Sequence, residues 1–167
     1  MNHPRLALLF LLIAGSVAAD DSRDAIFGQW ASDTSILEVS ESDGTLHARI
    51  VAILNPLYLQ NEDGPVGTPR VDLHNPDAAL RTRPLIGLDL LSGYQFKDGK
   101  WQGQLYDPES GKTYKSQITL GSDGKLNMRG YVGAPMFGRT AVWAPASSCS
   151  KNIVAMLAAS KLASSCG

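Results

Sequence analysis

The sequence has little of what metal, cofactor or redox chemistry requires. It contains two cysteines and three histidines in 167 residues. His47 and His74 are not spaced as metal ligands with each other or with a cysteine, so a zinc site has little support. Glycine-rich phosphate loops, serine nucleophile elbows and calcium-binding loops are absent as well. We therefore expect no metal ion, no cofactor and no standard hydrolase site.

Long apolar runs and an excess of one charge are also missing. The longest apolar run, residues 6–13, is far shorter than the roughly 20 residues that a transmembrane helix needs. The formal net charge at neutral pH is only −1, which gives no reason to expect binding to nucleic acid or to an anionic membrane. We expect neither a transmembrane segment nor a nucleic-acid partner.

The N-terminal residues have the order of a secretory signal peptide. Arg5 precedes the apolar run, and small residues follow it at 16–19, where a signal peptidase would cut. Cleavage after Ala19 predicts a mature chain, residues 20–167, that is periplasmic or secreted. No cysteine lies near this position, so we expect no N-terminal lipid anchor. Residues 1–19 hold one of the 15 basic and none of the 16 acidic residues, which leaves the mature chain at −2.

The mature chain shows the alternation of apolar and polar residues that is typical of β-strands. Asp43-Gly44 and Asp98-Gly99 separate strand pairs and favour tight hairpin turns, and residues 122–124 repeat this arrangement. About nine strands in sequential antiparallel order are predicted. They cover residues 29–32, 36–41, 45–54, 85–91, 93–97, 101–107, 113–120, 126–132 and 139–144. Because closure removes the two sheet edges, an up-and-down barrel is our first choice and a sandwich the second.

Two segments interrupt or follow the strands. Residues 55–84 form a long connection in which Asn75 and Pro76 predict the start of a short helix over residues 76–82, near one mouth of the barrel. After the last strand, residues 151–163 predict a helix that packs on the barrel wall. We expect a disulfide between Cys149 and Cys166, provided that the helix is short enough to let them meet. The predicted organisation is a signal peptide at 1–19, a barrel at 20–145 and a helical tail at 146–167.

Small residues on two neighbouring strands leave the state of the interior open. Gly103 and Ser116 should both face inward among large residues. They could border a ligand cavity, or they could be the small half of ordinary core packing.

A group of polar and charged residues is the candidate ligand site. Its members are concentrated near glycines and prolines at the end of the barrel that carries the long connection, and arginine can bind anionic or polar groups through charge-assisted bonds. The alternative is a structural network that closes this end of the barrel. The candidates are Asp77, Arg81, Arg83, Tyr106, Asp107 and Lys112.

Several ordered motifs resemble one family of exported bacterial proteins, the domain of unknown function 2147. They are GQW at 28–30, HNPDAALRTRPLIG at 74–87, YDPESGKTY at 106–114, LNMRGYVG at 126–133, GRT at 138–140 and Trp143. The resemblance covers residues 26–144. It implies a lipocalin-like barrel in the bacterial envelope or outside the cell, with no established activity.

The first motif also resembles the closure signature of lipocalins, in which an arginine of the last strand lies over a tryptophan of the first. This resemblance implies that Arg139 packs on Trp30 through a cation–π contact, with Arg129 as the alternative partner. Trp30, Arg129, Arg139 and Trp143 are therefore expected to be structural residues.

Three functions remain open at this point. The leading hypothesis is a binding module that holds a small apolar or amphipathic molecule inside the barrel. The second is an envelope interaction or stress protein that uses its outer surface, for example residues 77–83 or the tail. Enzymatic action, through Asp77 or Asp107 with nearby Arg and Tyr residues, is the least favoured.

Overall fold

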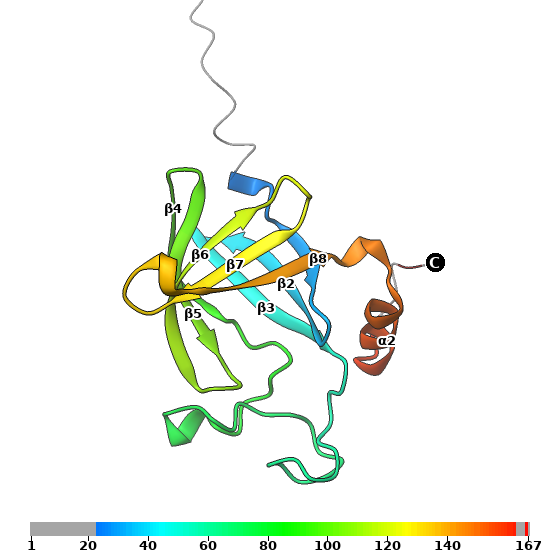
Figure 1. The fold of residues 1–167 in the computed structure, drawn as a ribbon. Helices are drawn as coiled ribbons and strands as arrows, with labels where there is room; N and C mark the ends of the chain where they lie inside the picture. Colours follow the sequence, from blue (N-terminus) through cyan, green and yellow to red (C-terminus); the bar gives the residue numbers. More distant parts are fainter. Residues whose placement is uncertain (1–22, 163–165, 167) are drawn as a thin grey trace, which may run out of the picture.

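The computed structural model describes residues 23–162 and 166, so the predicted signal peptide and its cleavage site lie outside the described residues. Within residues 23–162, eight antiparallel strands form a nearly closed up-and-down barrel, and the α-helix α2 (Lys151–Ala159) follows them (Figure 1). The predicted barrel is confirmed. The strands are β1 (Gly28–Ala31), β2 (Ser35–Ser42), β3 (Thr45–Ile53), β4 (Leu91–Lys97), β5 (Lys100–Asp107), β6 (Lys112–Leu120), β7 (Leu126–Tyr131) and β8 (Arg139–Pro145).

Each strand pairs with its neighbours in sequence except that β3 and β4 do not pair with each other, and β1 pairs in addition with β8. The hairpin turns form where the sequence predicts them. Asp43 and Gly44 have φ values of 52° and 73°, and Asp98 and Gly99 have 53° and 72°. Because Asp tolerates and Gly favours positive φ, these dipeptides let the strands reverse in two residues.

The prediction of a strand at residues 85–91 is wrong. Only its last residue, Leu91, belongs to a strand, because Gly87 at φ 91° breaks the extended backbone. The segment nevertheless bonds to β3: Gly87 N donates to Ile50 O at 2.7 Å, and Ile50 N donates to Leu88 O at 3.0 Å. It thereby fills the space between the two edge strands, β3 and β4, and brings the barrel close to closure.

The segment that precedes β1 closes one end of the barrel. Ile26 is 1% exposed, and its carbonyl accepts a 2.8 Å bond from Trp30 Nε1. Arg23 lies over the ring of Trp101, 5.1 Å from its centroid, while Arg23 O accepts from Trp101 Nε1 at 3.0 Å. Tryptophan and arginine therefore do meet at the barrel end, but through residues that the sequence interpretation did not select.

The predicted contact of Arg139 or Arg129 with Trp30 is wrong. Strand β8 meets β1 only at Ala144 and beyond, whereas Arg139 pairs with Gly130 five residues earlier. At ~3.3 Å per residue this places Arg139 about 17 Å along the strand from the β1 contact. Arg139 is exposed, and Arg129 bonds instead to the β7–β8 connection.

The small residues Gly103 and Ser116 make room for Tyr94. A Cβ atom at position 103 would lie 2.4 Å from Tyr94 Cδ2, and the Tyr94 hydroxyl is hydrogen-bonded to Ser116 Oγ. At this level of the barrel the two small residues are therefore part of ordinary core packing and do not border a ligand cavity, because the Tyr94 side chain fills the space beside them. Burial raises the pKa of Tyr94 to about 12.

The C-terminal helix packs on the wall as predicted. Ile153, Met156 and Leu157 are 2%, 0% and 4% exposed and contact a cluster that includes Ile36 and Ala52 of β2 and β3. The helix ends at residue 159, earlier than predicted.

The shorter helix allows the two cysteines to meet. Cys149 and Cys166 form the expected disulfide, with their Cα atoms 5.6 Å apart. In the described part of the chain no helix combines the length and the apolar character needed to cross a membrane.

Candidate functional site

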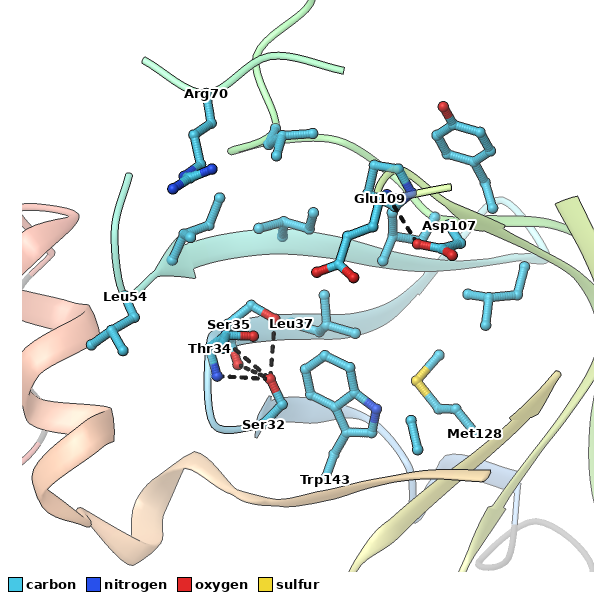
Figure 2. A pocket seen from close by; sticks show the side chains of 18 of the residues that line it. Ser32, Thr34, Ser35, Leu37, Leu54, Arg70, Asp107, Glu109, Met128 and Trp143 are labelled. Carbon is cyan, nitrogen blue, oxygen red and sulfur yellow. Dashed lines mark hydrogen bonds between the residues drawn. The ribbon is translucent and has the colours of Figure 1, made fainter. Parts of the chain in front are cut away.

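Residues at one end of the barrel line a cavity of about 590 Å³. This end carries the long connection between β3 and β4 and lies opposite the N-terminal segment (Figure 1). The turn between β1 and β2, the end of β3 and the turn between β5 and β6 surround the cavity (Figure 2). Its walls are mainly apolar, as is usual for pockets that take small organic molecules. Six of the apolar lining residues are Leu37, Ile50, Leu90, Leu105, Met128 and Trp143.

Trp143 is the largest side chain in this wall. Figure 2 shows its indole directed from β8 toward Leu37 on β2. Its Nε1 is buried and has no hydrogen-bond partner among the described residues. Leaving a buried donor without a partner costs about 1–3 kcal/mol.

Arg70 stands at the rim of the cavity and is held by other groups. Its Nη2 bonds both oxygens of Glu62, at 2.5 and 2.7 Å, and its Nε donates to Asn55 O at 2.6 Å. The guanidinium also lies 5.2 Å from the ring centroid of Tyr58. The bond from Arg70 lowers the pKa of Glu62.

Two carboxylates of the β5–β6 turn complete the rim. Asp107 Oδ1 accepts from Glu109 N at 3.0 Å, and Oδ2 accepts from Ser110 Oγ at 2.6 Å, so Asp107 holds the turn in shape. The side chain of Glu109 extends from this turn toward the cavity (Figure 2). Its carboxylate has no hydrogen-bond or ion-pair partner among the described residues.

The space continues beneath the long connection. A second hollow of about 280 Å³ shares Arg70, Leu85, Pro108 and Glu109 with the first. The remaining lining of this second hollow includes Asp63 and His74, and it is more polar than the lining of the main cavity. A molecule in the main cavity could therefore extend a polar end in this direction.

The structure brings some of the six predicted site residues together. Tyr106 and Asp107 line the cavity. Arg83 lies beside Tyr106, with its guanidinium carbon 5.6 Å from the ring centroid. Arg83 Nη2 is also 2.7 Å from Oδ2 of Asp72, whose side chain has no exposed surface.

The other three predicted residues lie outside the cavity lining. Asp77 caps the short 3-10 helix η1 (Ala78–Leu80) by accepting from Ala79 N at 3.0 Å, so the predicted helix is shorter and begins after Asp77 rather than Asn75. Arg81 Nε donates to Asn75 O at 2.7 Å. Lys112 is exposed and faces Asp107 across the β5–β6 pair.

Sequence reasoning missed Asp72 and the role of Asn75. Asn75 is 5% exposed, and its Nδ2 donates to Asp72 Oδ2 at 2.7 Å and to the Tyr106 hydroxyl at 3.1 Å. Burial, followed by the bond to Asp72, raises the pKa of Tyr106 to about 12. The predicted group contained both Arg83 and Tyr106, but nothing in the sequence pattern selected Asp72 as their buried acidic partner.

Sequence reasoning also missed Glu109 and Arg70 at the rim of the cavity, because little in the sequence indicated that they belong to a site. Glu109 lies inside the YDPESGKTY motif, and Arg70 lies in the long connection, but neither residue type was distinctive there. Among the described residues no group of three or more His, Cys, Asp or Glu side chains is placed to hold a metal ion.

Eight up-and-down strands around an end cavity define the class of lipocalin-like barrels. The sequence matches the model of the family described as "Uncharacterized protein conserved in bacteria (DUF2147)" over residues 28–144, and the chain belongs to this family. The family resemblance is thereby confirmed. No curated protein matches the sequence.

A solved structure supports the same fold. It is described as "Protein HP1028 from the human pathogen Helicobacter pylori belongs to the lipocalin family". The two chains superpose with a TM-score of 0.55 at 22% sequence identity, over 81% of this chain and 87% of the other. At this identity the similarity concerns the fold alone.

Proposed function

We propose that this protein is an exported carrier or sensor whose barrel binds a small apolar or amphipathic molecule. The observation that carries the proposal is the cavity of about 590 Å³ with its mainly apolar wall. This size lies inside the range of roughly 300–1,000 Å³ that is usual for ligand pockets. Burial of apolar ligand surface there supplies about 25 cal/mol per Å², which is the main source of affinity in such a site.

Exchange of the ligand is supported by the asymmetry of the barrel ends. The end with Trp101 and the N-terminal segment is packed with large side chains, and Trp101 is 2% exposed. Among the described residues, turns and the connection between β3 and β4 border the cavity end. A ligand would therefore enter and leave at the cavity end.

The direct test is titration of residues 20–167 with the neutral fluorescent probe N-phenyl-1-naphthylamine, together with native mass spectrometry after purification from the periplasm. Leu105→Trp should weaken probe binding at least about tenfold, because the larger side chain would occupy the cavity. Gln104→Trp is the matched control, because Gln104 is the exposed neighbour on the same strand. Equal binding by both variants, or no binding by the wild type, would contradict the proposal.

Export is part of the proposal and has its own test. The Cys149–Cys166 disulfide supports an oxidising compartment, where such bonds persist. Cell fractionation followed by N-terminal sequencing should find the chain in the periplasm or medium, beginning at Asp20. A cytoplasmic, uncleaved chain would refute this part and leave the ligand proposal standing.

A second candidate function, protein–protein interaction through the outer surface, is favoured by one exposed apolar group. Met136 and Phe137 are 76% and 78% exposed on the β7–β8 connection. Arg129 holds this turn by donating to Pro135 O at 2.7 Å and to Met136 O at 3.3 Å. Photo-cross-linking in cells from position 137 should then give a defined adduct, whereas Val154, 42% exposed on α2, serves as the control position.

A further inference from the structure

We propose that the occupant of the cavity is a cationic amphiphile, an amine with an apolar body, whose ammonium group lies at the rim against Glu109 and Asp107. This inference rests on the proposed ligand-binding function and names its ligand class. The apolar body would lie among the leucines, Met128 and Trp143 of the wall, and the charged end would face the β5–β6 turn.

The charges that line the cavity are the first step. Among the described residues that line the cavity, three carry a formal charge at neutral pH, namely Arg70, Asp107 and Glu109. Arg70 is already neutralised by Glu62, which receives two of its hydrogen bonds. An anionic head group would therefore compete with Glu62 for Arg70 while it approached two further carboxylates. Within the described part of the chain, the cavity lining offers no other cation to such a group.

The second step is the freedom of Glu109. Its carboxylate has no partner among the described residues, and its side chain extends toward the cavity (Figure 2). An ammonium group could bond to it without breaking any contact of the protein. Because both carboxylate oxygens are acceptors and an ammonium group has up to three donors, the pairing is charge-assisted.

The third step concerns Asp107, whose position is determined by the turn. Its two oxygens accept from Glu109 N and Ser110 Oγ, which fixes the carboxylate at the rim without removing its charge. Lys112 faces Asp107 across the strand pair but forms no ion pair with it among the described residues. Asp107 and Glu109 therefore both contribute negative potential at the opening.

The charged residues of the adjoining second hollow also favour a cationic ligand. Asp63, Glu62 and His74 line it, and Glu109 borders both spaces. His74 Nε2 lies 3.6 Å from Asp63 Oδ2, so the one histidine there is already beside an acidic group. A ligand end that reaches this hollow meets more carboxylates than cations, which again favours an amine over an acid.

Three chain-matched competitors test the ligand class. Dodecylamine, dodecanol and dodecanoate each displace N-phenyl-1-naphthylamine from residues 20–167, at neutral pH and low ionic strength. We expect the amine to bind about tenfold more tightly than the acid, with the alcohol between them, because the amine gains and the acid loses electrostatic free energy at the same rim. The preference should shrink as salt is added.

Variants at the rim identify the groups responsible. Glu109→Gln should reduce the ratio of amine to acid affinity several-fold and leave the alcohol unchanged, and Glu109→Lys should reverse the order of amine and acid. Asp123→Asn is the control, because it removes the same charge from the exposed β6–β7 turn and should leave the ratio unchanged. A ratio that responds equally to Asp123→Asn would show that only the net charge of the protein matters and would overturn the assignment.

The outcomes separate this inference from the function on which it rests. Binding of the alcohol and the acid as tightly as the amine would overturn the cationic ligand class and leave an apolar binding site intact. Failure of the probe and of all three competitors to bind would instead overturn the proposed function itself.

Discussion

The hydroxyl of Tyr106 donates a 2.6 Å hydrogen bond to Oδ1 of Asp72. Tyr106 belongs to β5, whereas Asp72 belongs to the long connection between β3 and β4 and is 0% exposed. Arg83 and Asn75 bond the other carboxylate oxygen, Oδ2. One buried carboxylate thus attaches the connection to the barrel next to the cavity.

The buried carboxylate gives the first prediction. Asp72→Asn should lower the free energy of unfolding by about 1–3 kcal/mol, because the buried Asp72 loses the charge that accepts bonds from Arg83, whose own side chain is 36% exposed and partly screened by water. Urea denaturation measures this change. Asp63→Asn is the control, because the Asp63 side chain is 80% exposed and its pair with His74 should contribute less than about 1 kcal/mol. Equal losses in the two variants would show that the Asp72 network does not stabilise the fold.

Replacement of Gly103 tests the packing of Tyr94. Gly103→Ala should destabilise the protein by about 1–3 kcal/mol, because the new Cβ would lie 2.4 Å from Tyr94 Cδ2 in a closely packed core. Gly130→Ala provides the comparison on β7, since its Cβ would meet Tyr114 Cβ at an ordinary 3.6 Å. Thermal unfolding of both variants should show a lower Tm only for Gly103→Ala. A comparable loss in Gly130→Ala would indicate a general cost of alanine in these strands.

The raised pKa values of Tyr94 and Tyr106 predict alkaline destabilisation. Burial raises the pKa of Tyr94 and Tyr106 to about 12, whereas a tyrosine of the unfolded chain ionises near pH 10. Below pH 10 both states keep the protons. Between pH 10 and 12 only the unfolded state releases them, so the free energy of unfolding falls as the pH rises, by at most about 1.4 kcal/mol per pH unit and tyrosine.

Denaturation in urea from pH 9 to 12 measures this slope. The double variant Tyr94→Phe/Tyr106→Phe should show a shallower decline than the wild type, even though its stability at pH 9 is lower because hydrogen bonds are lost. If wild type and variant declined in parallel, the alkaline loss would have to come from other groups.

Reduction of the disulfide gives a further prediction. Cys149 and Cys166 are 17 residues apart in sequence, and a closed loop of about 15 residues is worth roughly 3 kcal/mol by restriction of the unfolded chain. Cys149→Ser/Cys166→Ser should lose about this amount in guanidinium denaturation, and reduced wild type should match it. Equal stability of oxidised and reduced wild type would mean that the bridge does not constrain the unfolded chain.

Much of the barrel could be predicted from local patterns. Alternating apolar residues mark the strands, and Asp43-Gly44 and Asp98-Gly99 mark their turns, because strand periodicity and positive φ depend on a few neighbouring residues. The segment at 85–91 misled the prediction for the same reason. It has strand-like composition, but its hydrogen bonds to β3 and the positive φ of Gly87 follow from the shape of the gap that it fills.

The candidate site was less accessible to sequence reasoning. Tyr106 and Asp107 were selected and do line the cavity, whereas Arg70, Glu109 and Trp143 acquire their places there only when distant strands meet. The order of residues cannot reveal which side chains converge across several strands.

The sequence by itself determined the positions of most strands and of their hairpin turns, the amphipathic C-terminal helix and the two cysteines that join. Each of these follows from the chemistry of one residue or of near neighbours. The tertiary structure alone decided that Arg23 rather than Arg139 packs on a tryptophan, that Asp72 is the buried acid, and that a cavity remains beside Trp143. Those outcomes depend on burial and on strand register, which arise only when residues far apart in the chain pack together.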